Sequence, residues 1–349
     1  MKCTIQNIAD HLGLSRNTVS KALKNSSEVS ENTRNLVIKT ASKLGYKNAT
    51  FATPVIPASE TGSNGTILFL TRTYASDSEF WTTVLRGIES ILSNANYHLA
   101  ISIMSDSDLK QLNFPQTISD SSIKGIILVE ICDKVVCDAL SQFNLPIVSV
   151  DMPNVPFEEL NGIDVVTMES KKNLKKIINQ LIEKGAESFG FVGDLYSPNV
   201  SRGFQERYNA LSECLAEHQL PLNQKNCLLH QTPEDFRNFQ TTVNNLQAMI
   251  SLPDVFICGN DWTAIQLIYA LQFLGFQIPK DICVVGFDNI PAASRISPSL
   301  TTISTPQKYL GIAAARQILE RIQHPNCPHV FCQYETAVSY THLRAHETR

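Results

Sequence analysis

Long apolar runs are absent from this 349-residue chain, and nothing in it approaches the ~20 residues of a membrane-spanning helix. The N-terminus also lacks the apolar core of a secretory signal, because polar Gln6, Asn7 and Asp10 interrupt it. These absences predict a cytoplasmic protein. The length predicts two or three domains, and a hydrophobic content of 43% is enough for full-sized cores.

Cysteine pairs and catalytic spacings are missing as well. Nine cysteines are an odd number without a Cys-x-x-Cys pair, so we expect reduced thiols in a non-secreted chain. The eight histidines are scattered, and no Ser/His/Asp or phosphate-loop spacing occurs, which predicts a protein that is not an enzyme and needs no cofactor.

One cluster resembles a zinc site: His324, Cys327, His329 and Cys332 fall within nine residues. Residues 329–334 also read as a strand, however, and alternation along a strand would send His329 and Cys332 to opposite faces. The sequence therefore predicts no metal site.

Basic side chains are concentrated at the start of the chain. Residues 1–48 carry eight Lys or Arg against three Asp or Glu, a net charge of +5. The whole chain has a net charge of −4, which leaves −9 for residues 49–349. A basic block on an acidic remainder predicts that only the first block contacts phosphate groups.

The basic block has the pattern of two short helices joined by a turn. Thr4 can cap a helix over residues 5–12, where apolar residues recur at helical spacing, and Gly13 can end it. Ser15 then caps a second helix. The residues that this helix should bury are Val19, Ala22 and Leu23. This is the helix-turn-helix pattern, and the alternative is a small helical module with an ordinary basic face.

The exposed face of the second helix has the chemistry needed to read DNA bases. Arg16, Asn17, Ser20 and Lys21 face away from the buried residues. Arginine pairs with guanine O6 and N7, and asparagine pairs with adenine N6 and N7. A third helix is expected from the cap Ser30 to just before Gly45. The residues it should bury are Leu36, Val37, Thr40, Ala41 and Leu44.

The remainder alternates strands with helices. Residues 49–64 are mostly Ala, Thr, Pro, Ser and Gly and predict a linker. The predicted strands that follow are 67–71, 98–103, 125–129, 147–150, 189–192, 227–229, 255–258 and 283–286. Amphipathic stretches such as 81–92, 171–184 and 204–215 lie between them, which predicts parallel sheets covered by helices. Two sets of four strands, separated around residues 155–165, predict two similar lobes with a ligand cleft between them.

Polar side chains that directly follow strands are the candidate ligand residues, because the carboxyl ends of parallel strands face the cleft. They are Arg72, Glu130, Asp151, Asp194, Tyr196, Asn260, Asp261 and Asp288. Phe80, Trp81 and Trp262 could stack on a sugar or a base. Each of three candidates has an alternative role: Trp81 could belong to the core, Asp261 could cap a helix beginning at Trp262, and Asp288 could cap a turn.

The segment Thr4 to Lys47 resembles the DNA-binding headpiece of the lactose/galactose repressor (LacI/GalR) family. The matching pieces are Thr4-Ile5, Ile8-Ala9, Gly13-Leu14-Ser15, Thr18-Val19-Ser20, Val29-Ser30-Glu31, Thr33-Arg34 and Leu44-Gly45-Tyr46. In that family the positions of Arg16, Asn17 and Lys21 read bases in the major groove. The DNA-contacting residues that we expect are Thr4, Ser15, Arg16, Asn17, Thr18, Ser20, Lys21 and Asn25.

The resemblance continues to about residue 337. Its downstream pieces are Leu85–Glu89, Lys124–Leu128, Leu145–Val148 with Asp151, Gly203-Phe204, Asn260-Asp261, Pro279–Asp281, Val284–Asp288 and Pro298–Thr302. It implies a helix-turn-helix domain at 1–48 and, at 65–337, the two-lobed α/β fold of type I periplasmic binding proteins. The expected lobes are residues 65–160 with 292–322, and residues 161–291 with 323–337. The resemblance also implies that Phe80, Asp261 and Asp288 line an effector cleft.

The chain departs from the family in four places. Val200 stands where many members have an effector-binding arginine, and Glu169-Ser170 stands where Asp-Asn is frequent. Residues 49–64 lack Leu and Arg, which argues against a hinge helix whose leucine enters the minor groove. Residues 338–349 resemble no family C-terminus and are predicted to be a non-native tail.

The resemblance implies a transcriptional regulator, expected to be a repressor. We expect it to bind a near-palindromic operator as a homodimer and to respond to a small polar effector, most simply a sugar. The alternative is a solute- or nucleoside-sensing module without a role on DNA. The sequence leaves open which effector binds and whether it induces or co-represses.

Overall fold

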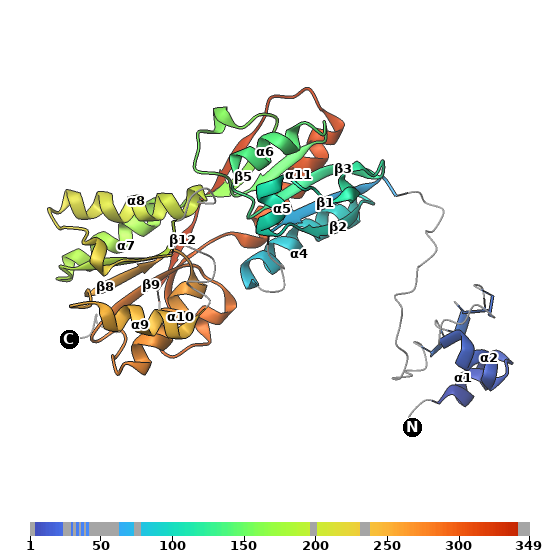
Figure 1. The fold of residues 1–349 in the computed structure, drawn as a ribbon, viewed down its shortest axis with the longest axis horizontal. Helices are drawn as coiled ribbons and strands as arrows, with labels where there is room; N and C mark the ends of the chain where they lie inside the picture. Colours follow the sequence, from blue (N-terminus) through green and yellow to red (C-terminus); the bar gives the residue numbers. More distant parts are fainter. Residues whose placement is uncertain are drawn as a thin grey trace. The chain divides into compact units, whose positions relative to one another are not determined.

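The computed structural model describes residues 4–23, 29–30, 33–34, 36–37, 40–41, 63–72, 78–195, 201–230 and 238–340. The chain divides into two compact units, residues 1–62 and residues 63–349 (Figure 1). We call the first unit the headpiece and the second the two-lobed unit. Asn25, Tyr196, Val200 and nearly all of the predicted linker 49–64 lie outside the described residues.

The headpiece begins with α1 (Ile5–Leu12) and α2 (Arg16–Leu23). Thr4 caps α1 and exchanges hydrogen bonds with Asn7, and Gly13 ends the helix with a φ of 65°, which favours glycine. The Ser15 hydroxyl accepts a hydrogen bond from the Thr18 N–H at 3.0 Å and caps α2. The buried residues that hold the headpiece together are Ile8, Ala9, Val19, Ala22, Val29, Val37 and Ala41.

The described residues between 33 and 41 are helical, in agreement with the predicted third helix. Val37 and Ala41 are fully buried, and the Arg34 Nη2 donates to the Val29 carbonyl at 3.0 Å, which ties this helix to the segment before it. The prediction that Leu36 is buried is wrong, since its side chain is 50% exposed. A turn of about 100° per residue carries Leu36 off the face that Val37 and Ala41 share.

The two-lobed unit contains two six-stranded sheets (Figure 1). The first has the order β11-β5-β4-β3-β1-β2, and its paired strands are parallel. Its strands are β1 (Thr66–Thr71), β2 (His98–Ile103), β3 (Ile123–Val129), β4 (Ile147–Val150), β5 (Asp164–Met168) and β11 (Phe331–Tyr334). The helices of this lobe are α4 (Glu79–Asn94), α5 (Asp106–Gln111), α6 (Lys134–Ser141) and α11 (Gln307–Gln323).

The second sheet has the order β12-β10-β9-β8-β6-β7 and is parallel except for β12, which runs antiparallel to β10. Its strands are β6 (Phe189–Asp194), β7 (Leu228–His230), β8 (Val255–Cys258), β9 (Cys283–Asp288), β10 (Thr301–Ser304) and β12 (Ala337–Ser339). Its helices are α7 (Lys172–Glu183), α8 (Arg202–Glu217), α9 (Phe239–Ala248) and α10 (Asp261–Phe273). Short 3₁₀ turns are η2 (Gln116–Ser119), η3 (Phe157–Glu159), η4 (Gln224–Asn226) and η5 (Pro291–Ser294).

The chain crosses between the lobes later than the sequence predicts. It leaves the first sheet after β5, returns after β10 to form α11, and crosses again between β11 and β12. The expected crossings near residues 160, 290 and 325 therefore place β5, β10 and β11 in the wrong lobes. Two of these strands, Asp164–Met168 and Thr301–Ser304, are short and carry polar residues, so their apolar pattern is weak.

Glu169 ties two of these crossings together. Its Oε1 accepts hydrogen bonds from the N–H groups of Lys171 and Lys172, both at 2.5 Å. Its own N–H donates to the Tyr334 carbonyl at 2.8 Å. The segment before α7 is thereby held against the segment that follows β11.

Asp164 and Arg321 form a buried ion pair in the first lobe. Asp164 is fully buried and accepts from Arg321 Nη2 at 2.8 Å, Arg321 Nε at 3.0 Å and Gln317 Nε2 at 3.0 Å. His329, one residue of the zinc-like sequence cluster, has its Nδ1 3.2 Å from the same carboxylate. In the described part of the chain, no group of three or more His, Cys, Asp or Glu could hold a metal ion. No helix formed by the described residues is long and apolar enough to cross a membrane.

Candidate functional site

The headpiece presents polar side chains on the first turns of α2. Arg16 and Asn17 are exposed, and Ser20 and Lys21 are half-buried beside the core residues Val19 and Ala22. The hydroxyl groups of Ser15 and Thr18 lie 2.8 Å apart and fix the start of the helix. A guanidinium and an amide near a helix N-terminus form the arrangement with which recognition helices contact base edges.

In the two-lobed unit, Arg207 is a buried cation that lies against two aromatic rings. It lies on α8 with 3% of its surface exposed, and its Nη1 donates to the Gly259 carbonyl at 2.6 Å. The centre of its guanidinium group lies 3.7 Å from the ring centroid of Phe287 and 5.1 Å from that of Phe204. Its Nε has no hydrogen-bond partner among the described residues. Among the described residues, this buried cation therefore keeps at least one N–H donor, that of Nε, without a partner.

Carboxylates from both lobes lie near enough to this cation to influence its charge. Asp151 follows β4 of the first lobe, and Asp288 ends β9 of the second lobe. Burial raises the pKa of Asp151 to about 6, although the Met152 N–H and the charge of Arg207 oppose the rise. Burial also raises the pKa of Asp288 well above its ordinary value, again opposed by Arg207. Burial lowers the pKa of Arg207 itself, and the charges of Asp288 and Asp151 counteract that effect.

Arg207 was not among the predicted ligand residues, because the position of the family's effector-binding arginine corresponds to Val200. A signal was nevertheless present. Arg207 lies three residues after Phe204 and four before Leu211, on the buried face of the predicted amphipathic helix. A charged residue on an apolar helix face needs a partner or a ligand.

Asp261 is fully buried and already bonded. Its Oδ2 accepts from the Ile290 N–H at 2.9 Å and its Oδ1 from the Thr302 hydroxyl at 2.5 Å. Burial raises its pKa to about 6, and these hydrogen bonds oppose the rise. The alternative role of Asp261, as the cap of a helix beginning at Trp262, is wrong. The helix α10 begins at Asp261, and its cap is Asn260, whose Oδ1 accepts from the Thr263 N–H at 2.9 Å.

Asp288 holds a strained position at the edge of the same cluster. Its φ of 121° lies where L residues are rarely found, and such strain is frequently concentrated at functional sites. The Asp288 carbonyl accepts from the Thr305 hydroxyl at 3.0 Å and from Gln307 Nε2 at 2.7 Å. These bonds come from the segment that returns to the first lobe, so they fix Asp288 at the junction of the lobes.

Four of the predicted residues of the first lobe contact neighbouring side chains: Arg72, Phe80, Trp81 and Glu130. Trp81 Nε1 donates to Glu130 Oε1 at 2.5 Å, and the ring of Trp81 packs edge-on against Phe80 with 4.6 Å between centroids. Phe80 is 7% exposed and belongs to the core. Arg72 Nη2 is bonded to Asp106 Oδ1 at 2.6 Å. Of the remaining candidates, Asp194 ends β6 and is half-buried, and Trp262 is 36% exposed on α10.

Models of two protein families match part of each unit. The model described as bacterial regulatory proteins, lacI family, matches residues 4–48. The model of the periplasmic binding protein-like domain matches residues 178–336.

Curated relatives match along nearly the whole chain. The ribose operon repressor of Haemophilus influenzae is 27% identical over 327 residues, which cover 93% of each chain. Catabolite control protein A of Staphylococcus xylosus is 27% identical over 336 residues, covering 93% of this chain and 96% of that protein.

Solved structures share the fold. The complex of the transcriptional regulator CelR with cellobiose has a TM-score of 0.69 at 18% identity and covers 97% of this chain and 99% of that chain. The lac repressor dimer bound to operator and an anti-inducer has a TM-score of 0.66 at 18% identity and covers 98% of both chains. A two-lobed α/β unit preceded by a helical headpiece is therefore the architecture of these structures as well.

Proposed function

The chain belongs to the lacI family of bacterial regulatory proteins, and we propose that it is a transcriptional repressor whose operator binding is modulated by a small neutral sugar. The observation that carries the proposal is Arg207, a buried cation with one hydrogen bond to the described residues, lying near carboxylates from both lobes. As a reader of DNA, the protein would act in the cytoplasm and would not be an enzyme.

The headpiece supplies the DNA contacts in this proposal. Arg16 and Asn17 would contact base edges in the major groove, while Ser15, Thr18, Ser20, Lys21 and Thr4 would contact phosphates or neighbouring bases. A single headpiece of this size buries only ~600–1,000 Å² on DNA, so two are needed for tight specific binding. Two-fold symmetry of the protein then requires two-fold symmetry of the operator.

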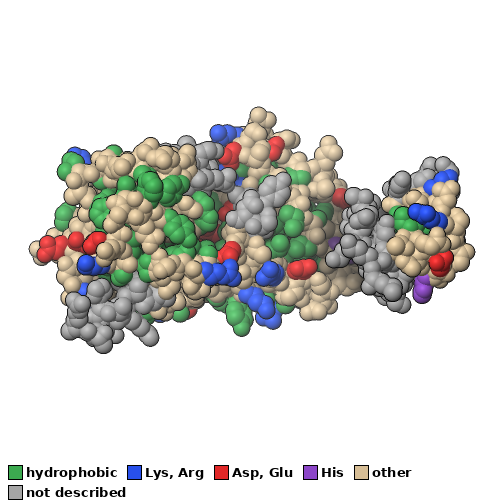
Figure 2. All heavy atoms as spheres, turned by 90° about the horizontal axis from the view of Figure 1, so that it is seen from below, with side chains coloured by type: hydrophobic (Ala, Val, Ile, Leu, Met, Phe, Trp, Pro, Cys, Tyr) green, Lys and Arg blue, Asp and Glu red, His purple; other side chains and the backbone are tan. Residues whose placement is uncertain are grey.

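A face of the second lobe supports self-association. Trp262, Tyr269 and Phe273 follow one another along α10 at spacings of seven and four residues, and they are 36%, 44% and 69% exposed. Phe239 of α9 adds a ring 5.9 Å from that of Phe273. Figure 2 shows hydrophobic side chains gathered toward the end of the molecule that holds these helices. A row of exposed aromatic side chains of this kind is typical of an interface, and we assign it to the homodimer.

The chemistry around Arg207 favours a neutral sugar over a charged effector. Sugar hydroxyls can accept from the guanidinium and donate to Asp151 and Asp288, and the rings of Phe287 and Phe204 offer apolar faces to the sugar. Asp151, which is ionised at neutral pH, offsets the charge of Arg207, so the described part of the cluster lacks the excess positive charge that a phosphate or carboxylate would need. The name of the ribose operon repressor and the structure of CelR with cellobiose support a sugar as the effector class.

The same arrangement explains how a sugar would alter operator binding. A ligand held by Asp151 of the first lobe and by Arg207 and Asp288 of the second favours one angle between the lobes. A dimer in which each chain changes its lobe angle presents its two DNA-binding units differently, which couples the sugar site to the operator.

Selection of binding sites from random DNA with the full chain tests the proposal. We expect enrichment of a two-fold symmetric sequence, and we expect at least one sugar from a panel that includes ribose and cellobiose to change the affinity for that sequence. Enrichment of no sequence, or the same operator affinity with every neutral sugar, would contradict it.

A further inference from the structure

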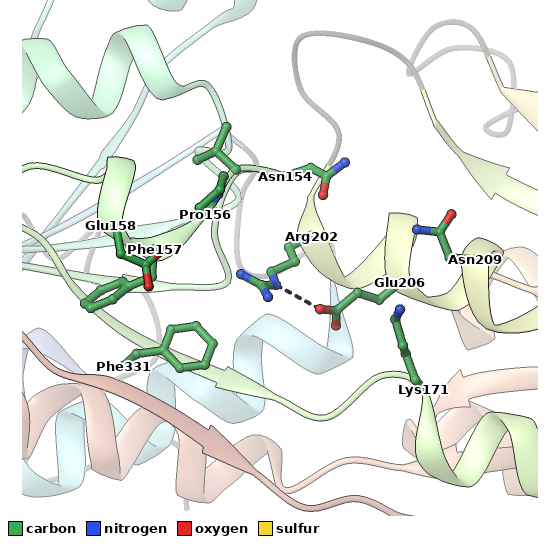
Figure 3. A pocket seen from close by; sticks show the side chains of 10 residues that line it. Asn154, Pro156, Phe157, Glu158, Lys171, Arg202, Glu206, Asn209 and Phe331 are labelled. Atoms are coloured by element: carbon green, nitrogen blue, oxygen red, sulfur yellow. Dashed lines mark hydrogen bonds and ion pairs between the residues drawn. The ribbon is translucent and has the colours of Figure 1, made fainter.

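A cavity of the two-lobed unit is lined by residues outside the Arg207 cluster (Figure 3). Its volume is about 550 Å³, within the usual range for small-molecule sites. Both lobes line it. Asn154, Phe157 and Glu158 follow β4, Phe331 begins β11, and Lys171, Arg202, Glu206 and Asn209 belong to the second lobe. We call this cavity the hinge groove.

The hinge groove and the Arg207 cluster use different faces of α8. Arg202, Glu206 and Asn209 form one stripe at spacings of four and three residues and line the groove. Gly203, Arg207 and Ala210 form the neighbouring stripe, which is buried. A ligand in the groove would therefore touch α8 without occupying the position of the proposed sugar.

Aromatic rings and a guanidinium group form the wall of the groove. The rings of Phe157 and Phe331 are 5.5 Å apart with an interplanar angle of 55°. The guanidinium centre of Arg202 lies 5.6 Å from the centroid of Phe331, and Arg202 Nε donates to Glu206 Oε1 at 2.8 Å, which holds the group in place. Aromatic rings with a flanking guanidinium are the surfaces on which proteins stack nucleobases.

Polar side chains around this wall suit the edge of a base. Asn209 Oδ1 accepts from Gln205 Nε2 at 2.8 Å, which leaves the amide nitrogen of Asn209 as a donor. Asn154 offers a donor and an acceptor, and Glu158 offers acceptors for ring N–H or amino groups. The charges of Lys171 and Arg202 are balanced by those of Glu158 and Glu206, so the lining gives no net attraction to a phosphate group.

The groove also lies where the lobes touch. The Arg202 N–H donates to the Met152 carbonyl at 2.9 Å, and Ser201 pairs with Pro153 in an isolated antiparallel bridge. Both contacts join the start of α8 to the first lobe beside the groove. A molecule bound between Phe331 and Asn209 would contact both lobes and would stabilise the lobe angle at which it binds.

We propose that the hinge groove binds an uncharged nucleoside, whose base stacks on Phe157 and Phe331 beside Arg202 while Asn209 and Asn154 bond its edge. The nucleoside acts as a second ligand, separate from the sugar, and alters operator affinity through the lobe angle. This inference goes beyond the proposed function, because it stands whichever compound binds near Arg207.

Calorimetric titration of the full chain with adenosine, guanosine, cytidine and uridine tests the inference. We expect at least one of these nucleosides to bind with a stoichiometry of one per chain. Phe331→Leu removes the stacking ring, and Asn209→Ala removes the edge donor. Each should weaken that binding about tenfold or more. Asn209 is partly exposed on α8, so we expect Asn209→Ala to fold. If Phe331→Leu fails to fold, nucleoside binding by Asn209→Ala tests the inference.

Arg207→Gln separates this site from the sugar site. Nucleoside binding should keep its wild-type affinity in that variant, and ribose, which has no base, should give no response that depends on Phe331 or Asn209. Failure of all four nucleosides to bind would overturn the inference. Binding that disappears in Arg207→Gln but persists in Asn209→Ala would also overturn it, because the nucleoside would then occupy the cleft.

Discussion

Arg16 in the headpiece and Arg207 in the two-lobed unit are both guanidinium groups that we assign to a ligand, yet their surroundings are opposite. Arg16 is exposed on the first turn of α2, whereas Arg207 is 3% exposed among aromatic rings and carboxylates. An exposed arginine keeps its hydration until DNA replaces it. A buried arginine has already lost that hydration, and the one hydrogen bond that it makes to the described residues, to the Gly259 carbonyl, offsets only part of the loss.

The difference suggests how each unit recognises its ligand. The headpiece would bind DNA through solvent-exposed charged and polar side chains. Its affinity should therefore depend on salt concentration, and the loss of one contact should weaken binding only moderately. The two-lobed unit relies on donors held in place before the ligand arrives, so removal of one central group should have a larger consequence.

The ion pair of the first lobe should matter for the stability of the two-lobed unit alone. Arg321→Leu leaves Asp164 buried without its cation and should lower the free energy of unfolding by about 3–5 kcal/mol. Gln317→Ala removes one neutral donor to the same carboxylate and should lower it by about 1 kcal/mol. Urea unfolding of the full chain measures both. Equal losses of unfolding free energy in the two variants would contradict this prediction. A similar loss of stability in the headpiece would contradict it as well.

The effect of Arg321→Leu should also depend on pH. Burial alone would raise the pKa of Asp164, but hydrogen bonds from Arg321, Gln317 and the Val330 N–H outweigh it and lower the pKa. A lowered carboxyl pKa stabilises the folded state above the ordinary aspartate range, and this contribution is lost as the pH falls through the lowered value. The difference between wild type and Arg321→Leu should therefore shrink in acid, as unfolding at neutral and acidic pH would measure.

In the headpiece, Arg16→Ala should reduce affinity for the selected operator by ~1–3 kcal/mol and relax base preference at one position. Gln6→Ala, a change on the exposed side of α1, is the matched control and should leave base preference unchanged. Repeating the selection of binding sites with each variant measures its base preference. Unchanged base preference in Arg16→Ala would remove Arg16 from the reading face.

Sugar affinity should rise several-fold between pH 5 and pH 7. Burial raises the pKa of Asp151 to about 6, so this carboxylate ionises within that interval and then accepts hydrogen bonds from sugar hydroxyls more strongly. Asp151→Asn cannot ionise and should flatten the profile, while operator affinity without sugar stays the same. Calorimetry between pH 5 and pH 7 measures the sugar affinity of the wild type and of Asp151→Asn. An equally steep rise of affinity with pH in Asp151→Asn would exclude Asp151 from the sugar site.

The smallest effect is expected from the predicted linker. Residues 49–64 lack the Leu and Arg of the family's hinge helix and contain Pro54 and Pro57. Insertion of four Gly-Ser residues after Thr61 should change operator affinity less than about threefold, because effective concentration varies slowly with linker length. Gel-shift titration gives the affinity. A collapse of binding on insertion would indicate an ordered hinge and a closer coupling of the two units.

Local patterns made the headpiece predictable. The caps Thr4 and Ser15, the turn at Gly13 and the buried Val19 and Ala22 all lie within a short stretch, and the structure places each of them as expected. Strands such as β2 and β4 were predictable for the same reason, since each is a short run between polar turns.

The Arg207 cluster was harder to predict because distant segments assemble it. Asp151, Arg207 and Asp288 come from three separate elements, and the local pattern does not reveal that they surround one point. For Asp261, the sequence could not show that Ile290 and Thr302 would already occupy its carboxylate. Polar strands such as β10 have a weak apolar pattern, so the sequence did not reveal where the chain crosses between the lobes.

The most direct test of the account is sugar binding by Arg207→Gln, measured by calorimetry with the same sugar panel. We predict that at least one neutral sugar binds the wild-type chain and that Arg207→Gln loses about 100-fold or more of that affinity, whereas Arg86→Gln, an exposed change on α4, binds normally. Operator affinity without sugar should be equal in all three proteins. Wild-type sugar affinity in Arg207→Gln would contradict the account, because the buried cation would then not be the group that holds the effector.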